Sequence, residues 1–351
     1  MKAFGEQGWA VGVEFEGIMS FNNASPAVFS GNPANKTPTS REPNLLIGTA
    51  VNPPANIRVV NNYLYHPLNT GVTNLRLGYI ANQSKNLTVE NNYVAGGAAI
   101  VSISGWENIS FKNNTLVGQD LSNGLIGAWP TATHDWTLDQ NLYFDSASNG
   151  STARRYSFSW LDPTQTIRNA FGGGRLAFDE APRYDAQGQM IGQGWRQWTG
   201  FDANSIYTPS LPTGVKVFVR PNQYESGRAN VAIYNWDHAN TVSVNLSGIG
   251  LTNGDQFEVR NVQNYFGPTV LTGTYNPASP TVNIPMTDLT VTPPIGQSFV
   301  PASTLPEFGV FLVKKNGNGA DAVTAYDAAL ALAQGRGALD AALIAQQAVA
   351  L

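Results

Sequence analysis

One short segment of the chain carries an aromatic ring, an imidazole and a carboxylate. Trp129, His134 and Asp135 lie close together in the sequence, and the chain has only three histidines. Imidazole and carboxylate groups act as general acids or bases near neutral pH. An indole ring beside them offers a flat apolar surface to a ligand. The structural alternative is a capped turn at the start of a strand with Trp129 in the core, and the sequence leaves both interpretations open.

A possible cationic partner lies upstream at Arg76. β-Elimination on a uronic acid requires a base and a cation that neutralises the substrate carboxylate. Arg76 together with His66 or His134 has the side chains for that chemistry. These residues are compatible with two reactions, elimination on a uronic acid and hydrolysis of a glycoside, and this is the case for elimination.

The second reaction is hydrolysis by two carboxyl groups. Glycoside hydrolysis uses carboxyl groups roughly 5 to 10 Å apart, one of them protonated. Asp120 lies in the loop before a predicted strand, and Asp135 begins another. Each can equally be an ordinary surface carboxylate, and the sequence singles out no pair. The other carboxylates of the region are Glu90, Glu107, Asp139 and Asp145.

These candidates lie on a repeated pattern of alternating apolar and polar residues that ends in an asparagine pair. A repeat of roughly 20 to 50 residues indicates a solenoid or similar array. The alternation predicts strands with one buried face, and asparagine suits the sharp bend that follows. Stacked coils would let the asparagine amides form an internal ladder. The copies occupy residues 56–64, 86–94, 108–116 and 135–143, with a weaker copy at 16–23.

Two further short apolar runs follow each bend, which makes three strands per turn. The sequence therefore predicts a parallel β-helix over residues 1–210. If the third strand of each coil forms the binding face, its outward residues and adjacent loops supply the polar and aromatic contacts of a sugar site. The outward positions are Asn74, Arg76, Ser102, Ser104 and Trp129, and the loops add His66, Trp106, His134 and Asp135.

The remainder of the chain differs from the repeat. Residues 194–205 predict a short helix and loop that closes the solenoid. Short alternating runs separated by turns predict a small β-sandwich over residues 211–315. Residues 316–351 predict a polar linker and an alanine-rich helical tail. The irregular insertion at residues 24–44 is expected to line a binding face.

Composition excludes several classes of function. Charged residues make up 13% of the chain and the net charge is −4, so no electrostatic case exists for binding nucleic acid. Cysteine is absent, which excludes disulfides and thiol catalysis. No apolar stretch is long enough to insert into a membrane, and no loop pattern indicates calcium or another cofactor. The opening residues lack a signal core, and the chain begins inside a coil, so we expect the C-terminal part of a longer β-helix.

The asparagine-pair coils resemble those of right-handed parallel β-helix repeat proteins. Residues 195–205, together with residues 231–236 and 257–266, resemble bacterial members that carry a small C-terminal β-sandwich. The resemblance covers roughly residues 1–315 and implies an all-β fold. Polysaccharide lyases, glycoside hydrolases, carbohydrate epimerases, phage tailspikes and adhesins share that fold, so it does not by itself decide the function.

The leading hypothesis is a secreted or cell-surface carbohydrate-active enzyme that cleaves a polysaccharide on the outer face of the β-helix. The alternatives are a non-catalytic glycan-binding or surface-adhesion protein, and a C-terminal fragment of a longer enzyme. The expected partner is a polysaccharide or other glycan. The candidate catalytic residues are Asp135, His134, Arg76 and Asp120, and the candidate substrate-binding residues are Trp129, Trp106, Asn74 and His66.

Overall fold

The computed structural model divides the chain into two compact units, Met1–Pro212 and Thr213–Leu351. Each unit has its own hydrophobic core. The candidate Asp120 and nearly all of the predicted helical tail lie outside the residues that the structure describes. The described residues are 2–4, 10–26, 38–49, 51–68, 70–79, 83–97, 100–119, 124–131, 134–146, 157–161, 175–188, 190–293 and 300–316.

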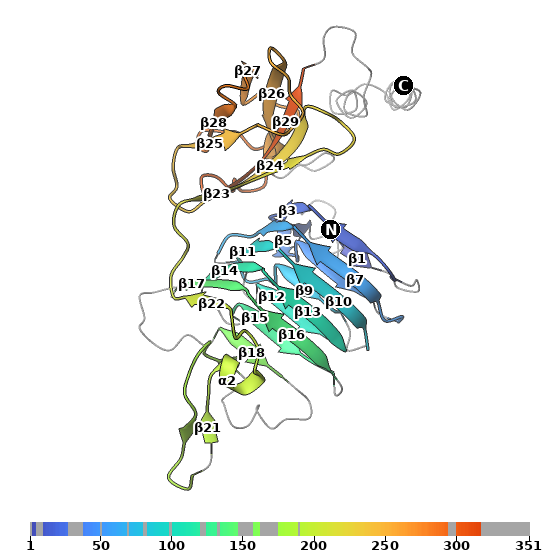
Figure 1. Ribbon diagram of the computed structural model, residues 1–351, viewed down its shortest axis with the longest axis vertical. Coiled ribbons are helices and arrows are strands. Elements are labelled where there is room, and N and C mark those ends of the chain that lie inside the picture. Colours follow the sequence, from blue (N-terminus) through green and yellow to red (C-terminus); the bar gives the residue numbers. More distant parts are fainter. Residues whose placement is uncertain are drawn as a thin grey trace. The chain divides into compact units, whose positions relative to one another are not determined.

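The first unit is built from three parallel sheets that the chain visits in turn (Figure 1). Sheet A contains β1 (Lys2–Phe4), β6 (Leu45–Gly48), β9 (Leu75–Leu77), β12 (Val101–Ser104), β15 (Ile126–Trp129), β18 (Phe158–Trp160) and β19 (Arg175–Leu176). Sheet B contains β2 (Glu14–Glu16), β7 (Ala55–Val60), β10 (Lys85–Glu90), β13 (Asn108–Lys112) and β16 (Asp135–Asp139). Sheet C contains β3 (Met19–Phe21), β8 (Tyr63–Tyr65), β11 (Tyr93–Ala95), β14 (Thr115–Gln119), β17 (Leu142–Ser146) and β22 (Ile206–Thr208). The repeating order of the sheets confirms the predicted parallel β-helix.

The alternation seen in the sequence sets which side chains enter the solenoid. In sheet B the residues Ile57, Val59, Leu87 and Val89 are all buried, while the residues between them point outward. Removing such an aliphatic side chain from water contributes about 1.5–3 kcal/mol. Every coil adds its own set to one continuous core, so the coils stabilise one another rather than folding separately.

The two asparagines of each pair have different roles. The first takes a left-handed backbone, with φ of 55° at Asn61 and 56° at Asn91, and asparagine adopts that conformation more readily than most residues. The second is buried and forms a ladder along the solenoid. The Asn62 side chain donates to Oδ1 of Asn92 at 2.9 Å, and Asn92 donates to Oδ1 of Asn114 at 2.9 Å. The predicted ladder is therefore present.

The last coil keeps the same device although its sequence departs from the pair. Gln140 takes the left-handed position with a φ of 59°. Asn141 takes the ladder position and accepts from Asn114 at 3.2 Å. The exception at residues 139–141 thus preserves the bend, because only the backbone conformation and the buried amide are needed there.

A short helix and the loop after it close the ladder at this end. Helix α2 (Trp195–Thr199) leads to Asp202, which is 1% exposed. The Asp202 carboxylate accepts hydrogen bonds from Asn141 Nδ2 at 3.1 Å, Tyr143 Oη at 2.9 Å, Ser205 Oγ at 2.6 Å and Trp195 Nε1 at 2.8 Å. Burial and the neighbouring Asp202 carboxylate raise the pKa of Tyr143 well above its ordinary value, so its phenol donates to the carboxylate.

Two hairpins project from the regular coils. The antiparallel pair β4 (Ala24–Pro26) and β5 (Pro38–Arg41) occupies both ends of the predicted irregular insertion, whose central residues lie outside the description. The second pair, β20 (Arg183–Tyr184) and β21 (Met190–Gly192), precedes α2. The insertion is therefore partly a hairpin rather than wholly irregular.

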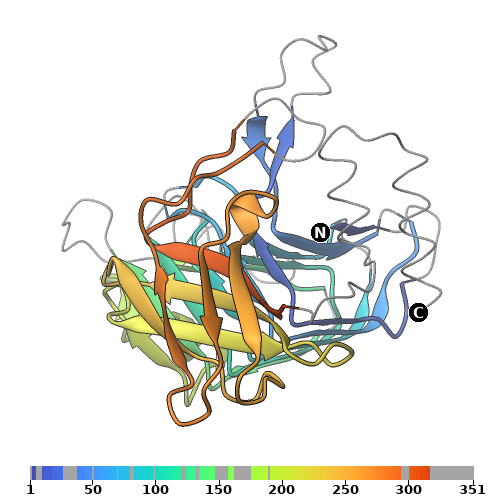
Figure 2. The same ribbon diagram turned by 90° about the horizontal axis from the view of Figure 1, so that it is seen from above.

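The second unit consists of antiparallel sheets, and its strands lie side by side in Figure 2, coloured yellow to red. Residues from both sheets form one buried core, which includes Val231, Val244 and Phe311. The larger sheet has the order β23 (Val215–Pro221), β24 (Arg228–Asn235), β29 (Phe308–Lys315), β26 (Gln256–Asn261) and β27 (Leu271–Thr274). The smaller sheet pairs β25 (Thr241–Asn245) with β28 (Thr281–Pro285), and a short 3-10 helix, η2 (Val262–Asn264), follows β26.

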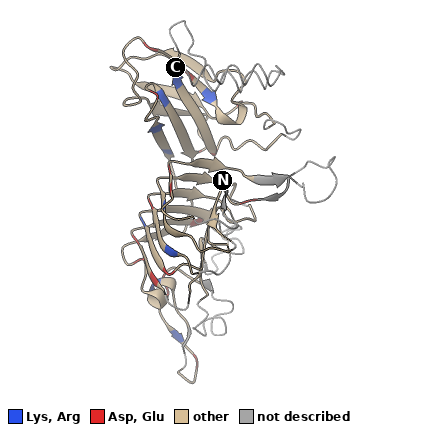
Figure 3. Cartoon of the chain, turned by 90° about the vertical axis from the view of Figure 1, so that its right-hand side faces the viewer, with Lys and Arg blue, Asp and Glu red and all other residues tan. Residues whose placement is uncertain are grey.

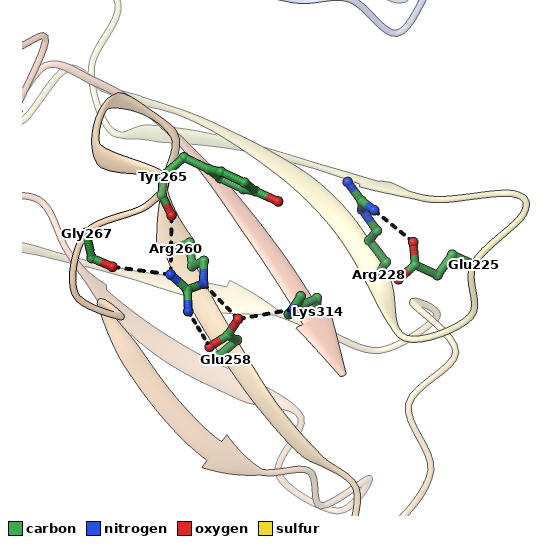
Figure 4. A network of polar contacts seen from close by, with 7 residues as sticks. All are labelled: Glu225, Arg228, Glu258, Arg260, Tyr265, Gly267 and Lys314. Atoms are coloured by element: carbon green, nitrogen blue, oxygen red, sulfur yellow. Dashed lines mark hydrogen bonds and ion pairs between the residues drawn. The ribbon is translucent and has the colours of Figure 1, made fainter. Parts of the chain in front are cut away.

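A charged network on the larger sheet joins two strands and a turn (Figure 4). The Arg260 guanidinium donates two hydrogen bonds to the Glu258 carboxylate, at 2.7 and 3.1 Å. It also donates to the carbonyl oxygens of Tyr265 and Gly267, each at 3.2 Å. Lys314 lies 3.6 Å from the same carboxylate. Because every member of this network has a partner, its arrangement is that of a structural brace.

Candidate functional site

The outer face of sheet A carries a row of polar side chains at matching positions of neighbouring strands. Arg76 of β9 pairs with Ser102 of β12, which pairs with Gly127 of β15, and Gly127 pairs with Ser159 of β18. Their neighbours Leu75, Leu77, Val101 and Ile103 are buried, so this row points out of the solenoid. Adjacent strands lie about 4.7–4.9 Å apart, which sets the spacing of the row.

Trp129 lies on this face, and the outer edge of its ring comes close to the backbone of Gly127. A Cβ atom placed on Gly127 would come within 2.8 Å of two ring carbons of Trp129. Trp129 is 39% exposed, so part of its side chain is available to solvent. Gly127 therefore leaves room for a partly exposed aromatic ring, a side chain of the kind that stacks on sugar rings.

A second exposed aromatic ring lies next to the cation of the face. Tyr79 is 41% exposed, and the Arg76 guanidinium carbon lies 5.2 Å from the centre of its ring. This distance is that of a cation–π contact, which orients the guanidinium. We use the term sheet A face for the surface formed by Arg76, Tyr79, Ser102, Ser104, Gly127, Trp129 and Ser159.

Carboxylates are missing from the strands beneath this face. No described residue within the strands of sheet A is an Asp or Glu. Lys and Arg (blue) and Asp and Glu (red) are sparse along the described solenoid in Figure 3. The described part of the sheet A face thus combines hydroxyls, two exposed rings and one cation.

Three residues expected to bind substrate are instead fully buried. Trp106, Asn74 and His66 are each 0% exposed. Trp106 belongs to the solenoid core. The prediction that Asn74 points outward was wrong, and the predicted loop residues His66 and Trp106 are buried as well. All three lie at corners between strands, where alternation no longer tells which way a side chain turns.

Asn74 and His66 hold the corners of adjacent coils together. Asn74 accepts from Asn44 Nδ2 at 2.8 Å and donates to the carbonyl oxygens of Ala95 and Gly96, at 2.7 and 3.0 Å. His66 Nε2 donates to the carbonyl oxygen of Glu42 at 3.0 Å. Asn44 and Asn74 therefore form a second, shorter amide ladder that the repeat did not reveal.

The three neighbouring candidates Trp129, His134 and Asp135 belong to different surroundings. Trp129 lies on the sheet A face, whereas Asp135 is exposed on the first position of β16 in sheet B. His134 Nδ1 donates to the carbonyl oxygen of Thr131 at 2.9 Å. Its ring packs edge-on against Trp136 and Trp160 at 6.2 and 5.3 Å. These contacts match the capped turn that was the structural alternative for this segment.

The remaining carboxylates of the region have structural partners. Asp139 accepts from the backbone nitrogen and from Nδ2 of Asn204, both at 2.7 Å. Partial burial raises the pKa of the Asp139 carboxyl, but the hydrogen bonds from Asn204 outweigh it, so the pKa lies below its ordinary value. Asp145 is buried and accepts from Tyr207 Oη at 3.2 Å and from Ser157 Oγ. Glu107 lies 3.6 Å from Lys85.

The sequence missed Tyr79 and Gly127. Tyr79 follows a strand at a position where the alternation ends, so only its exposure and its contact with Arg76 mark it. The signal for Gly127 was available in principle, because a glycine two residues before an aromatic on one strand leaves room for the ring.

Comparisons with protein-family models, with curated proteins and with solved structures gave no significant match. Within the part of the chain that the structure describes, no group of three or more His, Asp or Glu side chains could hold a metal ion. A search of the same residues for a helix long and apolar enough to cross a membrane finds none. The case for a function therefore depends on the chemistry of the exposed faces.

Proposed function

We propose that the protein binds a polysaccharide on the sheet A face and that it acts outside the cell, secreted or attached to a surface. The observation that carries the proposal is the pair of exposed rings, Trp129 and Tyr79, on the face that also carries Ser102, Ser104 and Arg76. Rings stack on the apolar faces of pyranoses, while hydroxyls and a guanidinium bond the polar groups. The proposal agrees with the resemblance of the coils to right-handed parallel β-helix proteins of the bacterial, carbohydrate-active type.

Binding without cleavage is the form of the proposal that we favour. Both hydrolysis and elimination need acid–base groups next to the bound sugar. The sheet A face includes Arg76, and the described strands of sheet A hold no carboxylate. Asp135 and His134 belong to other surroundings. A glycan-binding or surface-adhesion protein needs only the rings, hydroxyls and cation.

Cleavage is the second candidate, and Arg76 is the observation that favours it. The chain from β14 to β15 passes through Asp120 before it reaches the strand that carries Trp129. A carboxylate from this connection beside Arg76 would form the base and cation that elimination on a uronic acid requires.

Affinity electrophoresis in gels that contain single polysaccharides tests the proposal. We expect retardation by at least one polymer, and Trp129→Ala to weaken the affinity roughly tenfold, the effect of losing about 1.4 kcal/mol. Arg76→Ala should weaken binding to polygalacturonate or alginate more than binding to uncharged polymers. Tyr184→Ala, an exposed aromatic on β20, is the matched control and should leave binding unchanged.

The same polymers incubated with the protein distinguish binding from cleavage. New reducing ends together with the absorbance of an unsaturated uronate would identify a lyase, and reducing ends alone would identify a hydrolase. If either product forms and Asp120→Asn abolishes it, the second candidate replaces the first. Absence of both binding and products across the panel would refute the proposal.

A further inference from the structure

Sheet B has a shallow hollow on its outer face, on a different surface from the sheet A face. Its volume is about 240 Å³. Its walls come from three successive coils, through strands β10, β13 and β16. The lining residues are Asn86, Leu87, Thr88, Asn108, Ile109, Ser110, Asp135 and Thr137.

The polar lining forms two rows that cross the strands. Thr88, Ser110 and Thr137 occupy matching positions of neighbouring strands and form a row of hydroxyls. Asn108 pairs with Asp135 in the second row. Each row repeats at the strand spacing of about 4.7–4.9 Å. Each of the three coils therefore places a hydroxyl group at the same position along the solenoid.

The second row continues beyond the hollow into the preceding coil. Asn86 Nδ2 donates to Oδ1 of Asn56 on β7 at 2.8 Å. Asn56 and Asn86 both have a left-handed backbone, with φ of 55° and 57°. The amide row therefore spans more coils than the hollow itself, and a ligand lying along it would be linear.

The charges around the hollow decide which chemistry it would take. The lining contains one carboxylate, Asp135, and no cation. The basic side chains at neighbouring positions are paired. Arg58, which lies opposite Thr88, is 3.0 Å from Glu14, and Lys85 is 3.6 Å from Glu107. Hydroxyl and amide groups both donate and accept hydrogen bonds without carrying charge. The lining therefore suits an uncharged ligand rich in hydroxyl groups, and Asp135 would repel a polyanion.

We propose that this hollow is a second, independent binding site, which holds a neutral polysaccharide laid along the solenoid axis. Each sugar hydroxyl finds a donor or acceptor from the next coil, so contacts accumulate with the length of the polymer. The proposal stands apart from the sheet A face, where the rings and Arg76 set the chemistry. Two sites on one solenoid would also raise the avidity for polysaccharides that reach both.

The test removes the hydroxyls while keeping the shape of the strands. The triple variant Thr88→Val, Ser110→Ala, Thr137→Val keeps β-branched side chains at the threonine positions, so the fold should persist. Affinity electrophoresis of the full chain would use hydroxyethyl cellulose, galactomannan and dextran as probes. We expect at least one probe to retard the natural chain, and the triple variant to bind it about fivefold or more weakly because hydrogen bonds are lost.

Controls separate this site from the sheet A face. Thr115→Val on sheet C removes a hydroxyl elsewhere on the solenoid and should not change the affinity. Trp129→Ala should leave binding in the hollow intact. The proposal is overturned if no neutral probe binds the natural chain, or if a folded triple variant binds as before. It is also overturned if only Trp129→Ala removes binding, a result that would support the sheet A face alone.

Asn108→Ala gives a second variant should the triple variant lose its native circular dichroism. The Asn108 side chain is half-buried in the lining and belongs to the row of amides rather than the row of hydroxyls. Weaker binding to the same neutral probe, with an unchanged melting temperature, supports the site. Unchanged binding by this folded variant counts against it.

Discussion

Glycine and tryptophan at residues 127 and 129 act as one unit on the sheet A face. The ring can occupy its position only because Gly127 lacks a side chain. The functional property of this strand therefore belongs to a pair of residues, although only the aromatic attracts attention in the sequence.

We predict that Gly127→Ala weakens polysaccharide binding nearly as much as Trp129→Ala. The added methyl group would lie 2.8 Å from the ring, so the indole must tilt away from the strand. The effect on the free energy of unfolding should stay below about 1 kcal/mol, because the displaced ring is at the surface. Affinity electrophoresis and urea denaturation measure the two effects. Normal affinity in a folded Gly127→Ala variant would show that the ring orientation is unimportant.

The hydrogen-bonded carboxyl group of Asp139 should make the stability of the solenoid unit depend on pH. Its pKa is lowered from 3.8 in the folded protein, because the hydrogen bonds from Asn204 favour the charged form more than burial disfavours it. A carboxyl group whose pKa is lower in the folded state than in the unfolded state stabilises the folded protein when the pH lies above its ordinary pKa. This contribution is lost as the pH falls through the pKa of the folded state. We expect the natural chain to lose more stability than Asp139→Asn as the pH falls below about 4. Urea denaturation at several pH values measures this, and parallel losses would contradict it.

At the scale of elements, a two-residue bend joins a strand of sheet B to one of sheet C. Its left-handed residue is Gly17 between β2 and β3, asparagine in the next three coils and Gln140 after β16. The bend has two requirements, a left-handed residue followed by a buried amide, and different residues meet them. The last coil satisfies the first with Gln140 and the second with Asn141. This division explains why one copy tolerates a departure from the pair and still continues the ladder.

Substitutions at the second bend should separate the two requirements. Asn91→Gly keeps the left-handed conformation, so the free energy of unfolding should change by less than about 1 kcal/mol. Asn92→Ala removes a buried amide that bonds Asn62, Asn114 and the Val59 carbonyl. Its loss should cost about 2–4 kcal/mol, since several buried groups lose partners. Urea denaturation provides the comparison, and equal costs for both variants would disprove the division of roles.

At the scale of the whole molecule, the chain contains two units with separate cores and separate polar braces. In the solenoid unit the Asp202 carboxylate collects the buried donors at the end of the ladder. In the second unit the Arg260 guanidinium joins β26 to the turn that follows it. Neither brace shares a residue with the other, which allows the stabilities of the units to be altered one at a time.

We predict two thermal transitions that respond to different variants. Asp202→Ala should lower the free energy of unfolding of the solenoid unit alone by about 3 kcal/mol, because buried donors lose their acceptor. The melting temperature of only that transition should fall. Arg260→Ala should lower the free energy of unfolding of the second unit alone by about 2 kcal/mol, because Glu258 loses its bidentate partner. Differential scanning calorimetry measures both. One transition that shifts with either variant would show instead that the units unfold together.

The sequence by itself determined the coils, since alternation and the asparagine bend are local properties of the backbone. Ile57, Val59 and the ladder at Asn62 could be assigned because a strand has a period of two and because only a few residues suit the bend. The same patterns predicted the closing helix at Trp195 and the antiparallel unit beyond it.

Only the tertiary structure decided which polar residues share a surface. Trp129 and Asp135 are close in the chain yet lie on different sheets, while Arg76 and Ser159 are far apart and belong to one row. Trp106, Asn74 and His66 turned inward at corners where no local rule gives a direction. The physical reason is that a face of a solenoid is assembled by the register between coils, and that register joins residues which the sequence keeps apart.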